Sequence, residues 1–391
     1  MTARPMDIAP PGRVRLPDSG LGRGWEGAAV MGLTLLILSF GLVTLYSASS
    51  VYAIRQSLPD THFVLRQGIG AGFGLGLLVF CAYTPYRLWA HVAWPLVAAT
   101  VVMLLLCVLP WTLGIAPEVN GARRWLRIGI SIQPSEIAKI VIIVWSAAMA
   151  VKKIEHFRSL RRGLLPFLSV WVVVVGLILM EPDLSTAMIV SLLGTVVVFA
   201  AGARIAHFGF LGALAAPLLY LQLQVDFRID RLRIFLDPLS DPSGAGYQVK
   251  QSLVAFGSGG LHGVGIGEGR QKYGFLPEAH NDFIFAMIGE EWGLLGVLTI
   301  VVLYTGVVLV GFRVASRAPD LFGELLAVGC ASLVGVQAIL HMAVGLALAP
   351  ATGLALPLVS YGRSNLIVTL IAIGILISVA RAAPGGKASR A

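Results

Sequence analysis

Long apolar runs, separated by short polar segments, follow one another along almost the whole chain. A run of about 20 apolar residues is long enough to cross the hydrocarbon core of a bilayer as a helix. The pattern therefore predicts an all-α integral membrane protein with ten transmembrane helices. The predicted spans are 26–47, 67–84, 89–109, 135–151, 164–180, 184–202, 206–222, 283–312, 321–349 and 366–381.

The composition agrees with this interpretation. Hydrophobic residues make up 57% of the chain and charged residues only 13%, whereas an ordinary soluble domain carries roughly a quarter charged residues. The segment 1–24, rich in Pro, Gly and Arg, predicts a disordered cytoplasmic tail. Residues 25–382 then form a single membrane domain, and 383–391 a second cytoplasmic tail. The first apolar run is long enough to anchor the chain and does not resemble a cleavable signal.

The distribution of Lys and Arg orients the predicted helices. With both termini in the cytoplasm, the inner segments hold 16 of the 29 Lys and Arg residues, the outer segments hold 12, and Lys139 lies within a span. Six of the outer twelve lie in the long loop 223–282, where the positive-inside rule counts least. We therefore expect both termini inside and this loop, between spans seven and eight, outside.

The outer basic residues need their own explanation. They bind either anionic lipid headgroups or a phosphate-bearing substrate, since the guanidinium fork fits phosphate oxygens. The arginines concerned are Arg123, Arg124 and Arg127 in one loop and Arg228, Arg231 and Arg233 in another.

The long outer loop has two recognisable parts. Residues 247–256 are amphipathic and predict a short interfacial helix, and a glycine-rich run, 257–269, follows them. The run superficially resembles a dinucleotide fingerprint, but no strand–turn–helix pattern precedes it. We therefore expect tight turns and backbone close to a ligand or the membrane surface, with no nucleotide or nucleic acid as partner.

The stretch 273–293, YGFLPEAHNDFIFAMIGEEWG, joins an acidic loop to a long apolar helix that itself carries Glu290 and Glu291. Ionisable groups at a water–lipid boundary are costly and usually mark a functional site. Asp282 is the first candidate, although Asn281 and Asp282 would also serve as caps for the helix that follows.

Glu278, His280 and Asp282 form a trio that would suit a divalent cation, Mg²⁺ or Mn²⁺, but their spacing matches no known ligand pattern. The simpler interpretation of His280 is a solvated loop histidine. The sequence therefore assigns no metal ligands and leaves a divalent cation as the only cofactor still open.

Further polar residues lie near the predicted span ends. Glu136 and Lys139 either form a salt bridge along one helix face, or Lys139 balances Glu290 or Asp183 on another helix, since isolated charges in a bilayer need partners. Asp183, in a tight outer turn, is most simply a helix cap. The last outer loop, 350–365, is either a plain connection or a re-entrant loop, which requires that lipid be excluded.

Several motifs, in order along the chain, resemble those of the SEDS family, the shape, elongation, division and sporulation proteins. The resemblance runs nearly end to end, and the division branch of the family is more similar than the elongation branch. The motifs are NGARRWLRIG with QPSEIAK (120–139), EPDLSTA (181–187), GYQVKQSLVAFGSGG (246–260), FLPEAHNDFIFA (275–286) and GLALPLVSYG (353–362).

The resemblance implies a peptidoglycan glycosyltransferase that polymerises lipid II at the outer face of the bacterial cytoplasmic membrane. It also implies a class B penicillin-binding protein, a transpeptidase, as partner, together with other division proteins. The family's catalytic aspartate maps onto Asp282, which we expect to act as general base. The candidate substrate-binding residues are Arg66, Arg123, Glu136, Lys139, Asp183, Glu278 and His280.

The chain departs from the family pattern at a few positions. Asn281 replaces a usual Thr, Ser185 replaces a usual Gly, and His341 stands where the family often has Asn. Arg363 and Asn365 stand in SYGRSN where SYGGSS is expected. The aspartate itself is intact, so these departures bear on the last outer loop rather than on catalysis.

Two other functions stay open beside a polymerase of division or elongation. One is a lipid II flippase, which needs charged residues along a path through the membrane; Lys139, Glu290 and Glu291 are the only candidates. The other is a division scaffold without enzymatic activity.

Overall fold

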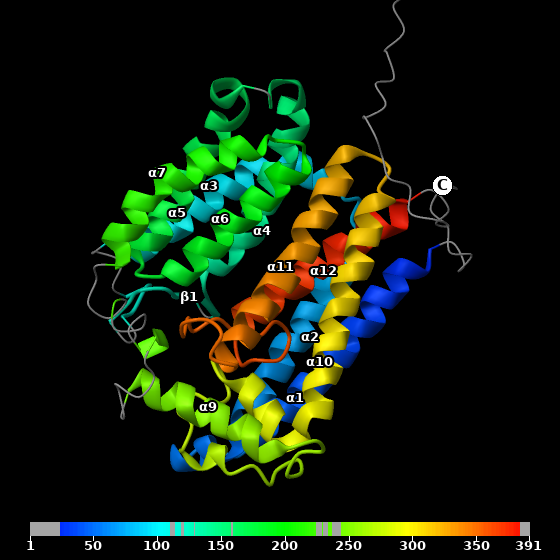
Figure 1. The fold of residues 1–391 in the computed structure, drawn as a ribbon. Coiled ribbons are helices and arrows are strands. Elements are labelled where there is room, and N and C mark those ends of the chain that lie inside the picture. Colours follow the sequence, from blue (N-terminus) through cyan, green and yellow to red (C-terminus); the bar gives the residue numbers. More distant parts are fainter. Residues whose placement is uncertain are drawn as a thin grey trace, which may run out of the picture.

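The fold is taken from a computed structural model, which describes residues 24–109, 114–118, 121–128, 130–157, 159–223, 229, 234–236 and 244–383. The chain is mostly helical, as predicted (Figure 1). Its main elements are α1 (Trp25–Arg55), α2 (His62–Tyr83), α3 (Leu88–Val108), β1 (Leu126–Ile128), β2 (Ile130–Ile132), α4 (Pro134–Lys153), α5 (Leu165–Met180), α6 (Leu184–Ala200), α7 (Ile205–Leu223), α9 (Ala245–Gly259), α10 (Ile284–Ser316), α11 (Leu321–Gly345) and α12 (Arg363–Ala382).

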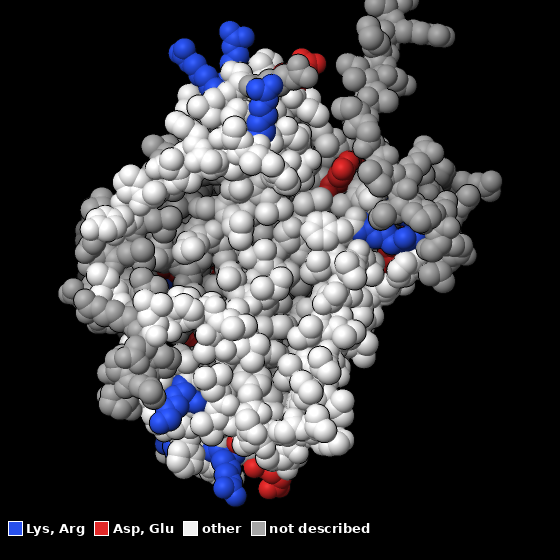
Figure 2. Space-filling model, viewed as in Figure 1, with Lys and Arg blue, Asp and Glu red and all other residues white. Residues whose placement is uncertain are grey.

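Within the described residues, seven helices are long and apolar enough to cross a membrane: α1, α2, α3, the run Leu160–Met180 that includes α5, α10, α11 and α12. Each of the ten predicted spans overlaps a helix, but α6 has only 17 residues and α4 carries Glu136, Lys139 and two terminal lysines. Figure 2 shows a waist almost without charge, with Lys and Arg gathered towards the two ends of the molecule. This distribution is typical of a protein that crosses a bilayer.

The helices form two groups on either side of a seam made by α4, α11 and α12 (Figure 1). One group contains α3, α5, α6 and α7. The other contains α1, α2 and α10, and α9 lies across one end. Gly27 near the start of α1 lies beside Ile377 and Ala380 of α12. The described ends of the chain therefore lie at the same end of the bundle, as an even number of crossings requires.

Two connecting segments have structure of their own. A helix is present where a short interfacial helix was predicted, since residues 247–256 lie within α9. The segment before α4 contains an antiparallel hairpin, which the sequence did not predict, in which Arg127 of β1 pairs with Ser131 of β2. The two predicted tails, 1–24 and 383–391, fall almost entirely outside the described residues.

The predicted span 283–312 corresponds to α10, but the helix breaks at Gly293, whose φ of 65° and ψ of −162° are not helical. A break frees backbone groups that need new partners inside a membrane. The glycine-rich run supplies them: Val264 N–H donates to Glu290 O at 3.0 Å, and Leu294 N–H donates to Gly260 O at 2.9 Å. The run thus packs as an extra layer against the break.

Glycine is required in this layer because backbone meets backbone. A Cβ on Gly259 would lie 1.9 Å from Gly289 O, and one on Gly263 would lie 2.1 Å from Glu291 O. The expected close approach is therefore present, but to α10 rather than to a ligand or the membrane surface.

The loop 346–362, which joins α11 to α12 and overlaps the predicted outer loop 350–365, is buried in protein. Leu356, Leu358 and Val359 are almost fully buried, and Tyr304, near the middle of α10, donates its hydroxyl to Pro357 O. A Cβ on Gly41 of α1 would lie 2.8 Å from Leu358 O. The loop is thus re-entrant in form, with protein around it in place of lipid.

The packing of α9 on α10 gives a direct test. Gly259→Ala places a methyl group against Gly289 O, whereas Gly257→Ala, on the same helix, meets nothing within 4 Å. Overpacking of this kind costs about 1–3 kcal/mol, so we expect Gly259→Ala to lower the melting temperature of the detergent-purified protein. Gly257→Ala should melt like the wild type. Equal melting of both variants would refute the close backbone contact.

Candidate functional site

Asp282 lies in a turn immediately before α10, with its side chain half-buried. Its N–H donates to Glu278 O at 3.1 Å. The N-cap position of α10 is Phe283, without a side-chain cap bond, so Asn281 and Asp282 lie just before the cap position. A Cβ on Gly353, which has a φ of 67°, would lie 3.6 Å from Asp282 Oδ2. The loop 346–362 therefore lies directly against the carboxylate.

The same loop fixes the backbone just before Asp282. Tyr361 N–H donates to His280 O at 3.1 Å, and Ser360 Oγ donates to Asn281 O at 2.8 Å. The loop is itself held by His341 on α11, whose Nδ1–H donates to Leu354 O at 2.6 Å. These bonds leave the turn that carries Asp282 little freedom to move.

On α2, Gln67 holds the loop through both ends of its amide. Its Nε2 donates to Ser360 O at 2.9 Å, and its Oε1 accepts from Gly362 N–H at 3.2 Å. Sequence reasoning missed Gln67 and singled out its neighbour Arg66, which is exposed. The sequence did contain a signal for Gln67, namely an amide side chain within an apolar span, because burying an amide is costly unless it is hydrogen-bonded.

On α6, the site residues also reach the loop. Asp183 accepts hydrogen bonds from Thr186 N–H at 3.1 Å and Thr186 Oγ1 at 2.9 Å, so the predicted helix cap is confirmed. Ser185, one of the departures from the family pattern, donates to Thr352 O at 3.0 Å. Its hydroxyl therefore ties α6 to the loop beside Gly353.

Glu136 and Lys139 form the predicted salt bridge within α4, at 2.6 Å. Asn365, another departure, donates its Nδ2–H to Glu136 Oε2 at 3.0 Å. The alternative partners of Lys139 are wrong for the part of the chain that the structure describes, since no ion pair joins it to Glu290 or Asp183. Lys139 is fully buried, so its charge is balanced inside the protein by Glu136.

His280 is not the solvated histidine expected from the sequence. It is 3% exposed and packs between aromatic rings, with centroids 4.7 Å from Tyr52 and 5.0 Å from Phe63. Burial lowers the pKa of His280 despite the opposing effect of Glu278. Glu278 is exposed and accepts from Asn281 Nδ2 at 2.7 Å. The imidazole is therefore neutral at pH 7 and acts through packing.

The cation considered for the trio does not fit its arrangement. Within the described residues, no three His, Cys, Asp or Glu side chains gather as metal ligands, and His280 faces aromatic rings instead of the two carboxylates.

The arginines predicted as a phosphate cradle are partly placed. Arg123 Nη1 donates to Leu109 O at 3.4 Å, and Arg124 Nε donates to Glu181 O at 3.0 Å. Each guanidinium group thus uses some of its N–H donors to hold backbone, Arg123 at the C-terminal end of α3 and Arg124 in the turn after α5. The other cluster, Arg228, Arg231 and Arg233, lies outside the described residues.

Glu181 opens the turn that Asp183 closes, and it is 2% exposed. Burial, and next the negative charge of Asp183, raise the pKa of Glu181 to about 8. The carboxyl is therefore protonated at neutral pH, which removes one charge from this buried turn.

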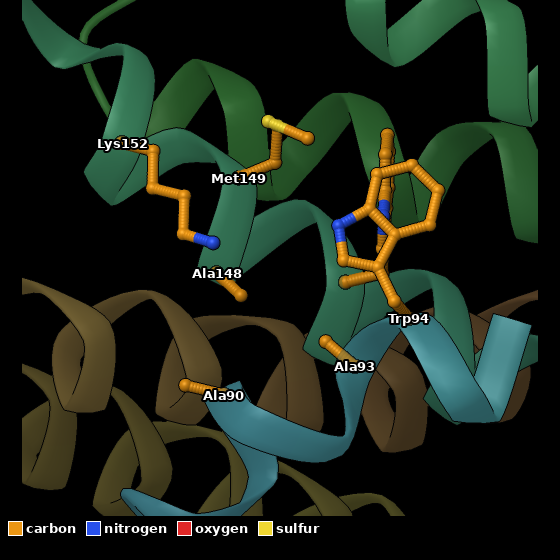
Figure 3. A pocket seen from close by; sticks show the side chains of 7 residues that line it. Ala90, Ala93, Trp94, Ala148, Met149 and Lys152 are labelled. Carbon is orange, nitrogen blue, oxygen red and sulfur yellow. The ribbon is translucent and has the colours of Figure 1, made fainter.

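A ligand would need open space on the face of the molecule where β1 and the loop 346–362 lie. Figure 2 shows hollows in that face, roughly level with β1 and the loop 346–362 of Figure 1, and red acidic atoms are visible within them. A separate small hollow lies between α3 and α4, lined by Trp94, Met149 and Lys152 (Figure 3). Lys152 is in the last turn of α4, at the opposite end from Glu136, so this second hollow is remote from Asp282.

Helices of this length around a half-buried acidic turn define a membrane-embedded helical protein. The family of cell cycle proteins that groups FtsW, RodA and SpoVE matches residues 28–384, and the chain belongs to this family. It is 41% identical over 349 residues to the probable peptidoglycan glycosyltransferase FtsW of Geobacter sulfurreducens, covering 89% of this chain and 93% of that protein. Stage V sporulation protein E of Bacillus subtilis is 39% identical over 351 residues, with 89% and 95% covered.

Solved structures have the same fold. One, described as the structural coordination of polymerization and crosslinking by a peptidoglycan synthase complex, contains a chain with TM-score 0.74 and 31% identity, covering 90% of this chain and 96% of that chain. The rod shape determining protein RodA of Thermus thermophilus matches with TM-score 0.66 and 29% identity, covering 93% and 98%.

The buried Glu181 gives a prediction about pH. Because its folded pKa of about 8 lies above the ordinary value of 4.5, the native state binds more protons, and stability falls as pH rises from about 4.5 towards 8. Glu181→Gln cannot ionise, so we expect it to remove this part of the pH dependence and to raise the melting temperature at pH 8. Melting curves from pH 5 to 9 measure this. Parallel profiles for the two proteins would contradict the raised pKa.

Proposed function

We propose that this chain is a peptidoglycan glycosyltransferase that polymerises lipid II at the outer face of the bacterial cytoplasmic membrane, with Asp282 as general base. The activity follows from its family and from relatives named as peptidoglycan glycosyltransferases. The observation that supports Asp282 is its position, half-buried at the start of α10 and enclosed by a turn that the loop 346–362 holds on two sides.

The proposed reaction needs one carboxylate. Asp282 takes the proton of the acceptor sugar's 4-hydroxyl group while the oxygen of that hydroxyl group attacks the anomeric carbon of the donor. The bond to polyprenyl pyrophosphate breaks at the same time, and this leaving group departs as an anion without a proton. Glycosidases, in contrast, use two carboxyl groups, one of which must protonate the leaving group. A single displacement inverts the configuration at the anomeric carbon.

Positive charge near the donor would stabilise the pyrophosphate as the bond breaks. We assign this role to Arg66, which is exposed on α2, and to Arg123, with Arg228, Arg231 and Arg233 as further candidates from the sequence. Glu136 with Lys139 and Asp183 then act through the elements that they hold: α4, which meets the start of α12 just after the loop, and α6, which borders the loop itself.

The buried charges favour the polymerase over the flippase. Lys139 is balanced by Glu136, and Glu290 and Glu291 are bonded to residues 270–272 of the preceding loop. A charged lipid headgroup that crossed the membrane along Lys139, Glu290 and Glu291 would have to break these contacts. Ten crossings with both termini inside would place the Asp282 turn outside, where lipid II polymerisation takes place. The related synthase complex supports a class B penicillin-binding protein as partner.

Asp282→Asn tests the base. The amide keeps the shape but cannot accept the proton, and loss of a general base typically costs 10²–10⁴-fold. We expect at least a hundredfold loss of glycan polymer from purified protein and lipid II, resolved on gels. Asp60→Asn, in the short loop between α1 and α2, is the control and should keep its activity. A native rate for a folded Asp282→Asn protein would end the assignment.

Arg123→Ala tests the cradle. Hydrogen bonds to charged groups are worth about 1.5–3 kcal/mol, so we expect kcat/KM for lipid II to fall about tenfold or more. The control is Arg204→Ala, an exposed arginine just before α7 that the charge distribution places on the inner side. Unchanged kinetics for Arg123→Ala would count against a pyrophosphate contact.

A further inference from the structure

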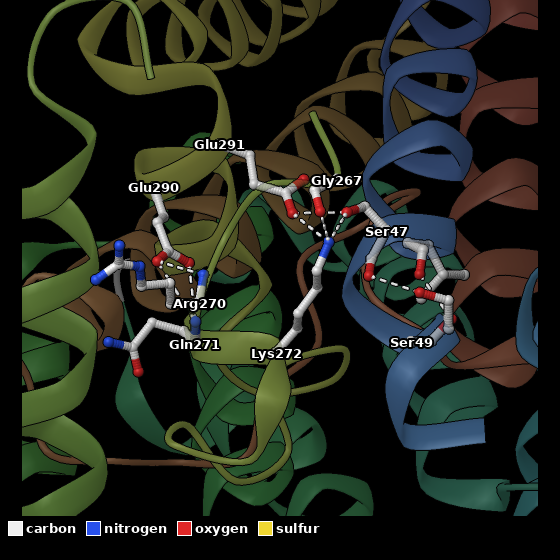
Figure 4. Close-up of polar contacts among 10 residues, drawn as sticks. Ser47, Ser49, Gly267, Arg270, Gln271, Lys272, Glu290 and Glu291 are labelled. Carbon is white, nitrogen blue, oxygen red and sulfur yellow. Dashed lines mark hydrogen bonds and ion pairs between the residues drawn. The ribbon is translucent and has the colours of Figure 1, made fainter. Parts of the chain in front are cut away.

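A buried polar cluster that the proposed reaction does not use lies at the base of the loop that carries Asp282. Its members are Ser47 on α1, Lys272 in the 3₁₀ turn Gln271–Tyr273, and Glu290 and Glu291 on α10. The lysine is 7% exposed and the two glutamates 2% and 1%. Figure 4 shows Lys272 extending between Ser47 and Glu291, with Glu290 over the backbone of the preceding loop. Buried charges are costly unless they are paired.

Lys272 is fully committed to this cluster. Its ammonium group contacts Glu291 Oε1 at 3.3 Å, Ser47 Oγ at 3.2 Å and the carbonyl oxygen of Gly267. The Ser47 hydroxyl in turn donates to Glu291 Oε1 at 2.6 Å. An ammonium has three N–H donors, so these contacts use all of them. Lys272 therefore holds protein to protein and is not arranged to bind a substrate phosphate.

Glu290 ties down the start of the same loop. Its Oε1 accepts from Arg270 N–H at 2.8 Å, and its Oε2 accepts from Gln271 N–H at 3.2 Å. These bonds join residues about twenty apart in the chain, as does the Lys272–Glu291 pair. Together they close the two ends of the segment 270–291, and Asp282 lies within it.

Gly269 permits the closure. A Cβ at this position would lie 2.8 Å from Glu290 Oε2 and 2.9 Å from Glu291 Oε1. The backbone before Arg270 is therefore pressed against both carboxylates. Gly269→Ala would disturb the cluster without removing any charge from it.

We propose that Lys272, Glu290 and Glu291 are positioning residues that hold the segment 270–291 in the geometry in which Asp282 meets the acceptor hydroxyl. The inference rests on the proposed role of Asp282. The cluster acts by closing the loop at its base and by tying it to α1 through Ser47. A general base must lie within hydrogen-bond reach of its proton, and a misplacement of about 1 Å costs about a hundredfold in rate.

Kinetics of the full-length purified protein with lipid II test the positioning role. We expect Lys272→Met and Glu290→Gln to lower kcat about a hundredfold with little change in KM. The double variant Lys272→Met/Glu291→Gln should recover part of the loss, since removing both partners leaves no unpaired buried charge. Glu268→Gln, an exposed carboxylate on the same loop, should behave like the wild type. A double variant no better than Lys272→Met would show that the loss does not come from an unpaired buried charge. A loss confined to KM would indicate substrate binding. Either result would overturn the proposal.

Hydrogen–deuterium exchange tests the closure independently of catalysis. We expect faster amide exchange across residues 272–283 in Glu290→Gln and Gly269→Ala, and wild-type exchange in Glu268→Gln. Unchanged exchange in the first two variants would show that the cluster does not hold the loop. Faster exchange with an unchanged kcat would show that the closure does not position Asp282. If Asp282→Asn is active, the proposed function fails, whereas the exchange data still decide whether the closure exists.

Discussion

Backbone that leaves the helical conformation at membrane depth must find hydrogen-bond partners within the protein. This constraint governs two irregular segments of the fold, the break in α10 and the loop 346–362. The break in α10 at Gly293 is completed by the glycine-rich run, through bonds such as Leu294 N–H to Gly260 O. The loop 346–362 is completed by side chains from three helices, Gln67, His341 and Tyr304. Asp282 lies against the loop 346–362 and just before the start of α10, eleven residues ahead of the break, so it depends on the loop directly and on the break only through α10.

The buried charges follow a related rule. Two buried charged groups near the site are paired: Glu136 contacts Lys139 on the same helix and Asn365 on α12, and Glu291 contacts Lys272 and Ser47. Losing one member of a buried pair leaves the other unpaired. The contact of Glu136 with Asn365 joins α4 to α12, and the contacts of Lys272 join the segment before α10 to α1. Polar groups thereby fix contacts between helices that apolar packing alone leaves free to slide.

The sequence predicted the helices well because each is an apolar run with clear polar ends. It predicted the importance of Asp282 from motif resemblance and from the cost of an acid at the membrane boundary. It could not predict the surroundings of His280, because ring packing with Tyr52 and Phe63 joins three segments far apart in the chain. The break at Gly293 was equally hidden, since the residues that satisfy it lie about thirty positions earlier. Local periodicity predicts which face of one helix is apolar, and it carries no information about contacts between residues this far apart in the chain.

The departures from the family pattern also have a structural explanation. Arg363 packs over α2, where a Cβ on Gly70 would lie 3.2 Å from its Cγ, so a glycine on the neighbouring helix makes room for the larger side chain. Ser364 Oγ accepts from Gln133 N–H, and Asn365 bonds to Glu136. These three residues anchor the start of α12 on α2 and α4. The bonds to the turn that carries Asp282 come instead from Ser360 and Tyr361, which match the family motif, so Arg363 and Asn365 change how α12 begins and leave these bonds as they are.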